Sequence, residues 1–388
     1  MTDHSSHGLK PQTLCVHAGE PRPPLNGAVT LPVFQTSTYL LGDGEHDYHR
    51  IRYLRLNNSP NHDALGQKLA ALEGTEAGLV AASGMAAITA ALLAFLKNGD
   101  HVIAQDCLYG GTRVFLDQAR ERYGIAVTYV SLERPAEWEA ALRSTTKLFY
   151  VESITNPLIE VGRLDEAAAF AKRRGILSLI DSTFTSPINF QPARLGYDII
   201  LHSATKYLNG HSDLVAGAIA GRQSLVDKVR ENLNILGGAL DAHACFLLQR
   251  GLKTLPLRMR CQNENARQLA AWLARHAQVA SVRYPGLETD AAFARARAWF
   301  SGAGGMLSFV PRGGLRAARD VIARLRLALH APSLGGVETL VCRPASTSHA
   351  ALPAEVRARM GIDDALIRVS VGIEDTSDLL DDFARALE

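Results

Sequence analysis

The sequence predicts an α/β protein with a mostly parallel sheet in a large domain and a smaller α+β domain towards the C-terminus. Between about residues 78 and 204, short apolar runs alternate with segments long enough for helices, which is typical of parallel strands joined by crossover helices. After about residue 250 the chain becomes rich in Arg and Ala and more helical. These two observations predict the fold class.

The composition is that of a soluble globular protein. The chain has 388 residues, too many for one small domain, and 47% of them are hydrophobic. The formal net charge is only +2, without a long run of one sign, so nucleic acid is a poor candidate for a partner. Residues 1–10 lack the apolar stretch of a signal peptide, and no apolar run reaches membrane-spanning length. We therefore expect no membrane association.

Cysteine usage indicates the cellular compartment. The sequence holds five cysteines without a CxxC pair, an odd number that argues against a disulfide framework or a structural zinc site. We therefore expect no bound metal and a reducing, cytoplasmic location. The cysteines are Cys15, Cys107, Cys245, Cys261 and Cys342.

The individual elements follow from periodicity. Residues 1–60 are rich in Pro, Gly, Asn and Arg with little periodicity, and we expect an arm that lies on a neighbouring subunit. In the next segment Leu65, Leu69 and Leu72 share one helical face, and Gly74 is a plausible helix stop. The large domain, residues 61–251, has predicted strands at 78–83, 101–106, 126–132, 148–153, 176–181 and 198–204. The α+β domain, residues 252–388, has a predicted helix at 263–277 and predicted strands at 304–311 and 365–375.

Polar and small residues gather where the predicted strands of the large domain end. In an open parallel sheet the carboxyl ends of the strands form the ligand crevice, so we expect these residues to share one edge. Their types match an aromatic, phosphorylated and cationic cofactor. In chain order they are Ser83-Gly84-Met85, Tyr109 with two following glycines, Asn156-Pro157, Asp181, and finally Ser203, Thr205 and Lys206.

Each of these residue types has a chemical reason to be there. A lysine in a crevice can lose its proton and form an imine, as Lys206 would. A buried carboxylate such as Asp181 holds a pyridine nitrogen protonated, and Tyr109 beside glycines can lie flat on a ring. A helix start such as that at residues 83–85 offers N–H groups to a phosphate, with strand hydroxyls beside it.

Taken singly, each feature also has an ordinary structural explanation. A lysine after a strand is usually a solvated surface residue, and Ser-Gly at a helix start is more often only a cap. Asp181 alone is as well explained as a turn or helix cap, and Asn156-Pro157 as a turn. Tyr109 alone is more typical of packing than of a cofactor platform.

Together the motifs resemble the Cys/Met-metabolism enzymes that depend on pyridoxal 5'-phosphate (PLP). This family includes cystathionine γ-synthase, cystathionine β- and γ-lyases, methionine γ-lyase and acylhomoserine sulfhydrylases. The strongest match is DIILHSATKYLNGHSD at 198–213, which is similar to the family's cofactor-lysine signature. The supporting matches, in the family's order, are SGM at 83–85, YGGT at 109–112, ESITNP at 152–157, DSTFTSP at 181–187, SLGGVETL at 333–340 and LIRVSVGIED at 366–375.

The resemblance implies an aminotransferase-like fold of type I, PLP as cofactor, and a role for each matching residue. Lys206 would form the Schiff base and move protons, Asp181 would pair with the pyridinium nitrogen, and Tyr109 would stack on the ring as an acid–base candidate. The remaining cofactor contacts would be Ser83, Gly84, Met85, Ser203 and Thr205 at the phosphate and Asn156 at the ring hydroxyl. The substrate contacts would be Arg368 and Ser333 at the carboxylate and Glu338 at a distal amino group.

The chain departs from the family pattern at two places. The family's Tyr-x-Arg, which reaches the phosphate of a neighbouring subunit, corresponds best to Tyr53 and Arg55, although the following stretch is one residue longer. Tyr48 and Arg50 are a second, poorer-spaced candidate pair. This match predicts active sites shared between subunits of a dimer that pairs into a tetramer. The second departure is Arg343, which replaces the family's usual histidine at the rim of the substrate pocket.

The motifs do not choose among β-elimination, γ-elimination and γ-replacement, because all three use the same groups around the cofactor. We favour a cystathionine lyase, with cystathionine γ-synthase as the alternative. Methionine γ-lyase is less favoured because Gly111 stands where those enzymes tend to have cysteine, and the sulfhydrylases are longer chains. A nucleotide-binding oxidoreductase would need a GxGxxG between a strand and a helix, which is absent, and the intact lysine signature speaks against an inactive scaffold.

Overall fold

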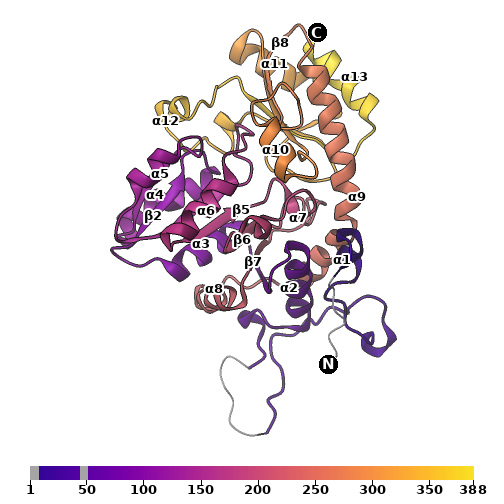
Figure 1. Cartoon of the computed structure of the whole chain (residues 1–388). Helices are drawn as coiled ribbons and strands as arrows, with labels where there is room; N and C mark the ends of the chain where they lie inside the picture. Colours follow the sequence, from indigo (N-terminus) through magenta and orange to yellow (C-terminus); the bar gives the residue numbers. More distant parts are fainter. Residues whose placement is uncertain (1–7, 44–50) are drawn as a thin grey trace. The chain divides into compact units, whose positions relative to one another are not determined.

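The computed structural model describes residues 8–43 and 51–388. The chain divides into two compact units, each made of two stretches of sequence (Figure 1). Unit 1 comprises Met1–Leu96 and Gln191–Pro256, and unit 2 comprises Lys97–Phe190 and Leu257–Glu388. The three-part division into residues 1–60, 61–251 and 252–388 stays a prediction.

Unit 1 is built around strands that pair in the order β1-β7-β6, with both pairings antiparallel. The predicted strands at 78–83 and 198–204 are present as β1 and β6, whereas β7 was not predicted. Its sequence GAIAG is weak in strand propensity, yet all five of its residues are buried. The elements of unit 1 are α1 (Pro11–His17), η1 (Leu25–Gly27), η3 (Leu54–Leu56), α2 (Pro60–Glu73), β1 (Ala77–Ala81), α3 (Gly84–Phe95), η4 (Pro192–Leu195), β6 (Ile199–Ser203), β7 (Gly217–Gly221) and α8 (Gln223–Leu236).

Helix α2 has clear start and stop signals. Ser59 caps its N-terminus by accepting a hydrogen bond from the His62 N–H, and Pro60 occupies the first helical position. Gly74, the predicted stop, ends the helix in the left-handed conformation with φ of 69°. The fully buried Lys68 of α2 donates to the Cys15 carbonyl at 2.8 Å, so α2 holds the short helix α1 within the predicted arm.

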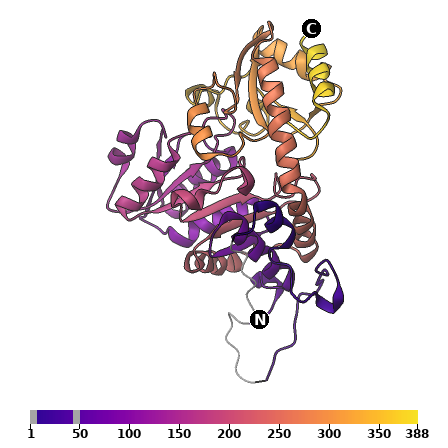
Figure 2. The ribbon, with the colours of Figure 1, turned by 45° about the vertical axis from the view of Figure 1, so that its right-hand side comes forward.

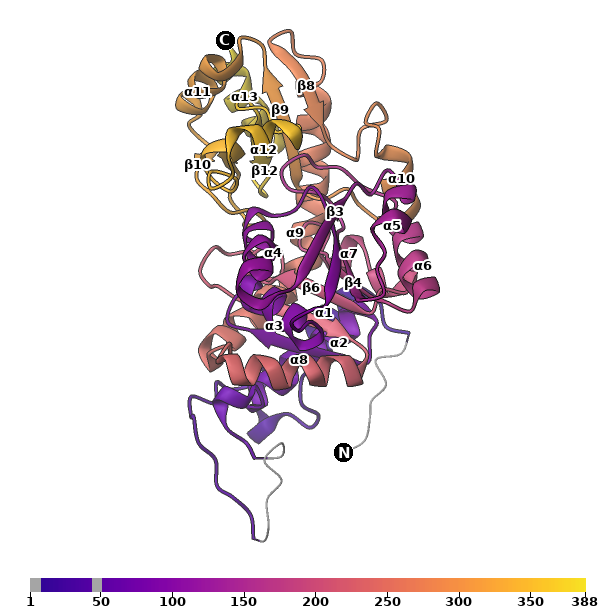
Figure 3. The same cartoon turned by 90° about the vertical axis from the view of Figure 1, so that its left-hand side faces the viewer.

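Unit 2 contains a parallel group of strands in the order β5-β4-β2-β3. The chain passes outward from β2 to β3 and then back through β4 to β5, so right-handed crossovers place the connecting helices on both faces. Figure 3 shows α4 on one side of β3 and α5 and α6 on the other. These elements are β2 (His101–Gln105), α4 (Gly110–Tyr123), β3 (Ala126–Val130), α5 (Pro135–Ala141), β4 (Thr146–Glu152), α6 (Leu164–Arg174), β5 (Leu177–Asp181) and α7 (Ser186–Asn189).

The C-terminal part of unit 2 forms a five-stranded sheet in the order β10-β11-β12-β9-β8, in which only β10 and β11 are parallel. Its core packs Leu307 and Phe309 of β9 against Phe383 of the last helix. The elements are β8 (Val279–Arg283), α10 (Phe293–Trp299), β9 (Met306–Pro311), α11 (Gly314–Arg324), β10 (Leu329–His330), β11 (Leu340–Cys342), η5 (Pro344–Ser346), α12 (Ala354–Arg359), β12 (Ile367–Ser370) and α13 (Thr376–Leu387).

One long helix, α9 (Ala242–Leu273), continues from unit 1 into unit 2 (Figure 2). It is 32 residues long. It begins at Ala242, well before the predicted start at residue 263, and ends at Leu273, before the predicted end at residue 277. Pro256, where unit 1 ends, lies inside it. Within residues 8–43 and 51–388, no helix is long and apolar enough to cross a membrane.

Candidate active site

The N-terminus of α3 lies directly against the ends of β6 and β7 in unit 1. Ser83 caps the helix by accepting from the Ala86 N–H at 3.0 Å. A Cβ atom on Gly84 would lie 2.8 Å from Ser203 Cβ, and one on Gly217 would lie 2.2 Å from the Ser83 carbonyl oxygen. Two glycines therefore permit this approach, which brings Ser83, Gly84 and Ser203 together. Gly217 was missed because it stands within the unpredicted strand.

This arrangement is suited to a phosphate. In the first turn of a helix the N–H groups have no acceptor within the helix, and those of Gly84 and Met85 occupy that turn. They carry the positive end of the helix dipole, and the hydroxyl-bearing Ser203 borders them. Because residue 84 is a glycine, Ser203 can lie against this helix start, where its hydroxyl can join the N–H groups in binding an anionic group.

Lys206 lies in a turn that follows β6 and is fixed by backbone contacts. Its N–H donates to the Ser203 carbonyl at 3.1 Å, and its own carbonyl accepts from the Gly210 N–H at 2.8 Å. The turn also packs closely on α9, because a Cβ on Gly251 would lie 2.3 Å from the Asn209 carbonyl oxygen. Lys206 is half-buried.

The neighbouring Thr205 hydroxyl has partners within the chain. It donates to the Ala216 carbonyl at 3.2 Å and accepts from the Ala216 N–H at 3.0 Å. These bonds join the turn that carries Lys206 to Ala216, the residue directly before β7. The predicted role of this hydroxyl, donation to a phosphate, requires its hydrogen to leave the Ala216 carbonyl.

Tyr53 and Arg55 lie at the surface of unit 1, where η3 meets the end of α8. Arg55 Nη1 donates to the Asn234 carbonyl at 3.1 Å, and its guanidinium lies 5.7 Å from the centre of the Tyr53 ring. The Tyr53 side chain is 38% exposed. The alternative pair, Tyr48 and Arg50, lies outside the described residues.

Asp181 and Glu152 stand side by side at the ends of two strands of unit 2. Asp181 ends β5, Glu152 ends β4, and the two are paired in the parallel register. Both are buried, with 8% and 4% of their surface exposed. Asp181 accepts from the Thr183 N–H at 2.9 Å. Burial, followed by the charge of Asp181, raises the pKa of Glu152 well above its ordinary value.

Tyr109 is held by its backbone while its ring is 40% exposed. Its N–H donates to the Glu152 carboxyl at 2.6 Å. The turn after it packs on the segment that follows β11, since a Cβ on Gly110 would lie 2.2 Å from the Ser348 carbonyl oxygen. The ring is thus presented by a fixed backbone, as a stacking residue requires.

Arg368 joins Asn156 and Ser333 in unit 2. The guanidinium is buried on β12 and donates to Asn156 Oδ1 at 3.0 Å and to the Ser333 carbonyl at 2.9 Å. Its Nε has no hydrogen-bond partner among the described residues, and none of their carboxylates forms an ion pair with it. A buried cation in this state favours an anionic ligand. Glu338, in the loop before β11, is half-buried.

His349 is a residue near Arg368 that sequence reasoning missed. It is buried, with Nε2 3.3 Å from the Leu108 carbonyl oxygen and Nδ1 2.9 Å from the Ser348 hydroxyl. Burial, together with the charge of Arg368, lowers its pKa to about 4. A feature of the sequence could have indicated it, because His349 ends RPASTSH, the stretch in which Arg343 departs from the family pattern. Arg343 itself donates through Nε to the Asp364 carbonyl at 2.9 Å.

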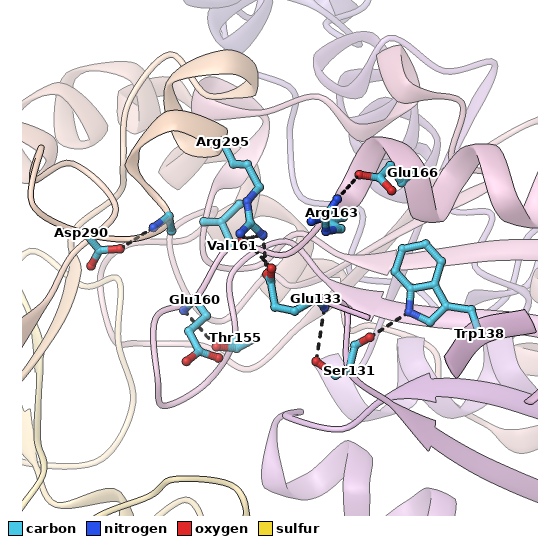
Figure 4. Close-up of polar contacts among 11 residues, drawn as sticks. Ser131, Glu133, Trp138, Thr155, Glu160, Val161, Arg163, Glu166, Asp290 and Arg295 are labelled. Carbon is cyan, nitrogen blue, oxygen red and sulfur yellow. Dashed lines mark hydrogen bonds and ion pairs between the residues drawn. The ribbon is translucent and has the colours of Figure 1, made fainter. Parts of the chain in front are cut away.

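The loop that carries Asn156 is braced at its far end (Figure 4). Thr155 and Glu160 close the loop on each other, with the Glu160 N–H donating to the Thr155 hydroxyl at 3.0 Å. Beyond this turn, Arg295 of α10 donates to the Val161 carbonyl at 2.8 Å and forms a two-pronged ion pair with Glu133. The bracing limits the freedom of Asn156 without occupying its side chain.

Residues 12–388 match the model of the family described as Cys/Met metabolism PLP-dependent enzyme. The chain belongs to this family. It is 42% identical to cystathionine gamma-lyase of Bacillus subtilis (strain 168), over 98% of this chain and 100% of that protein. It is 40% identical to cystathionine beta-lyase of Lactococcus lactis subsp. cremoris (strain MG1363), over 97% of this chain and 98% of that protein. Among solved structures, it is similar to cystathionine gamma synthase from Xanthomonas oryzae pv. oryzae in complex with aminoacrylate and cysteine, with a TM-score of 0.94, 39% identity and 98% coverage of both chains.

Membership confirms the predicted fold class and the cofactor. This PLP-dependent enzyme has the fold of the family's solved structures, with mostly parallel strands in its large sheet. The nucleotide-binding oxidoreductase is therefore set aside. The helix start at Gly84, with Ser203 beside it, fits the cofactor phosphate, and the buried Asp181 fits a cationic ring nitrogen, so the residues present suit PLP.

Proposed function

We propose that this PLP-dependent enzyme is a cystathionine lyase, which breaks a carbon–sulfur bond of its amino-acid substrate by β- or γ-elimination. The observation that carries the proposal of an amino-acid substrate is the buried Arg368, which has no ion pair with any described carboxylate and so suits a substrate carboxylate. The choice of reaction is supported by the cystathionine lyases among its relatives. The alternative, cystathionine γ-synthase, is supported by the similarity to a solved structure of such an enzyme, which is 39% identical and has a TM-score of 0.94.

In this proposal, the bound cofactor supplies an electron sink for the bonds at the substrate Cα. Lys206 would anchor the cofactor and would take the substrate Cα proton on Nζ. Asp181 would hold the ring nitrogen protonated through charge pairing. Tyr109, whose backbone is fixed by Glu152, would stack on the ring and would pass a proton to or from the substrate. Ser83, Gly84, Met85, Ser203 and Thr205 would hold the phosphate.

The substrate would be oriented by its two ends. Arg368 receives the α-carboxylate as a two-pronged donor, with Ser333 beside it, and Glu338 receives the distal amino group. Asn156 bonds the ring hydroxyl through its amide nitrogen, because its oxygen already accepts from Arg368. Arg343 is occupied by the Asp364 carbonyl, so we propose no direct substrate contact for it. A cytoplasmic location is part of this proposal, supported by five cysteines that form no disulfide.

A product assay on cystathionine tests the reaction. Pyruvate together with homocysteine identifies β-elimination, whereas 2-oxobutyrate together with cysteine identifies γ-elimination. Either result is expected and supports the lyase. If neither product forms, and cystathionine instead accumulates from an O-acylhomoserine and cysteine, the chain is a cystathionine γ-synthase and the lyase proposal fails.

We also propose that two subunits share each active site, in a dimer that pairs into a tetramer. Tyr53 and Arg55 would reach the neighbour's phosphate from the end of α8. Support comes from apolar side chains at that end, where Ile235 is 82% and Leu236 is 54% exposed. Such exposed apolar groups, adjacent on one helix, are suited to cover by a second copy of the chain.

Complementation between two inactive variants is expected to restore activity. Lys206→Ala and Arg55→Ala each damage one contribution to the site, and in a mixed dimer one site collects both lesions while the other is intact. Random subunit exchange should therefore restore about a quarter of the wild-type sites, because half of the dimers are mixed. Exchange is followed with two differently tagged variants. If mixed dimers form without activity, Arg55 serves its own subunit and the shared-site proposal is wrong.

A further inference from the structure

Glu152 and Asp181 carry neighbouring carboxyl groups, and their surroundings determine which of the two is ionised. Both are at the C-terminal ends of adjacent parallel strands, in register, so their side chains point to the same face of the sheet. Both are buried. Two carboxyl groups that share a buried site do not both ionise readily, because each charge disfavours the other.

The carboxyl group of Glu152 is hydrogen-bonded to backbone N–H groups and forms no ion pair among the described residues. Its carboxyl accepts from the Tyr109 N–H at 2.6 Å and is also hydrogen-bonded by the Asn156 backbone. Its own N–H donates to Gln105 Oε1 at 2.9 Å. None of the ion pairs of the described residues involves Glu152. One carboxyl therefore links the two segments that carry Tyr109 and Asn156.

The surroundings of the Glu152 carboxyl oppose its ionisation. The charged group acting on it is Asp181 on β5, and the titratable groups near it are Tyr150 on β4 and Cys107 after β2. Arg368 of β12 is a cationic side chain in this network, but it donates to Asn156, and no ion pair among the described residues joins it to Glu152. His349 lies beyond Asn156, and burial keeps its pKa low, so it adds no positive charge at neutral pH.

We infer that Glu152 is a positioning residue that stays protonated beside the ionised Asp181 and fixes the backbones of Tyr109 and Asn156. The single negative charge of the pair then remains on Asp181, the residue proposed to face the cofactor nitrogen. This inference rests on the proposed function only in placing Asp181 at the cofactor nitrogen. The pKa of Glu152 is raised in agreement with it. Burial is the largest cause and the charge of Asp181 the next, and together they outweigh the two backbone N–H donors, which by themselves lower the pKa.

The variant Glu152→Gln separates a protonated carboxyl from an ionised one. Glutamine keeps an acceptor oxygen for the Tyr109 N–H and a donor in place of the carboxyl O–H, but it has no proton to lose. Glu152→Ala removes both. The matched control is Glu121→Gln, at a solvent-exposed glutamate of α4.

Infrared difference spectra of the full-length enzyme with bound cofactor report the proton directly. Wild type minus Glu152→Gln should show the carbonyl stretch of a protonated carboxyl at neutral pH, and wild type minus Glu121→Gln should not. Because the folded-state pKa is raised, the band should persist as the pH rises past 4.5, the ordinary value, and should disappear only at the higher folded-state pKa. A carboxylate band at neutral pH in the Glu152 difference would overturn the inference.

Hydrogen exchange tests the positioning. The Tyr109 and Asn156 amides should exchange slowly in wild type and in Glu152→Gln, and at least roughly tenfold faster in Glu152→Ala, because the acceptor is lost only there. Equal protection in all three proteins would contradict the anchoring role. In activity, Glu152→Gln should retain roughly tenfold more kcat than Glu152→Ala.

The two proposals fail in distinguishable ways. Asp181→Asn with wild-type kinetics, combined with the expected infrared band, would remove the proposed cofactor role of Asp181 and leave the protonation of Glu152 standing. An inactive Asp181→Asn combined with a carboxylate band from Glu152 would leave the proposed function standing and remove the inference.

Discussion

Replacement of Lys206 by alanine is expected to lower kcat by at least about 10⁴-fold. The lysine is proposed both to anchor the cofactor and to carry the Cα proton, and alanine offers no group for either task. The fold should survive, because the turn is held by backbone hydrogen bonds from Lys206 and Gly210 that alanine also makes. Steady-state elimination of thiol from cystathionine gives the rate, and circular dichroism checks the fold.

Lys228→Ala is the matched control, since Lys228 is an exposed lysine of α8 in the same unit. It should keep wild-type kinetics and the yellow colour of the lysine-bound cofactor, whereas Lys206→Ala should lose that colour. A folded Lys206→Ala protein that eliminates thiol near the wild-type rate would show that another group carries the proton.

Arg368→Lys is expected to raise the KM for cystathionine about 100-fold, with a smaller change in kcat. The guanidinium is buried and donates through separate nitrogens to Asn156 and to the Ser333 carbonyl, which fixes its plane. An ammonium retains the charge but cannot present a planar pair of donors to a carboxylate while keeping both contacts. KM and kcat measured separately decide the outcome.

Two further variants make this test specific. Arg368→Gln removes the charge as well and should raise KM more than Arg368→Lys does. Arg316→Lys, at an arginine whose side chain is 94% exposed, should leave both constants unchanged. A KM for Arg368→Lys within about threefold of wild type would place the carboxylate-binding group elsewhere.

Much of the local structure was open to prediction because it depends on residues close in sequence. The strands β1 to β6 coincide with the predicted apolar runs, and α2 ends at the predicted Gly74. Lys206 lies just after β6, as expected from its place at the end of the predicted strand 198–204. The Gly/Ala strand β7 was missed because its burial depends on its neighbours and not on its own side chains.

The sequence by itself determined the family and the cofactor, and it carries the proposal for Lys206, since each depends on motifs of a few consecutive residues. Tertiary structure alone decided which residues meet. The Arg368–Asn156 hydrogen bond joins positions 212 residues apart, and the Glu152–Asp181 pair depends on the register of two strands. Periodicity predicts that a strand forms and which face it buries, but register and close backbone approach are set by the packing of the complete fold.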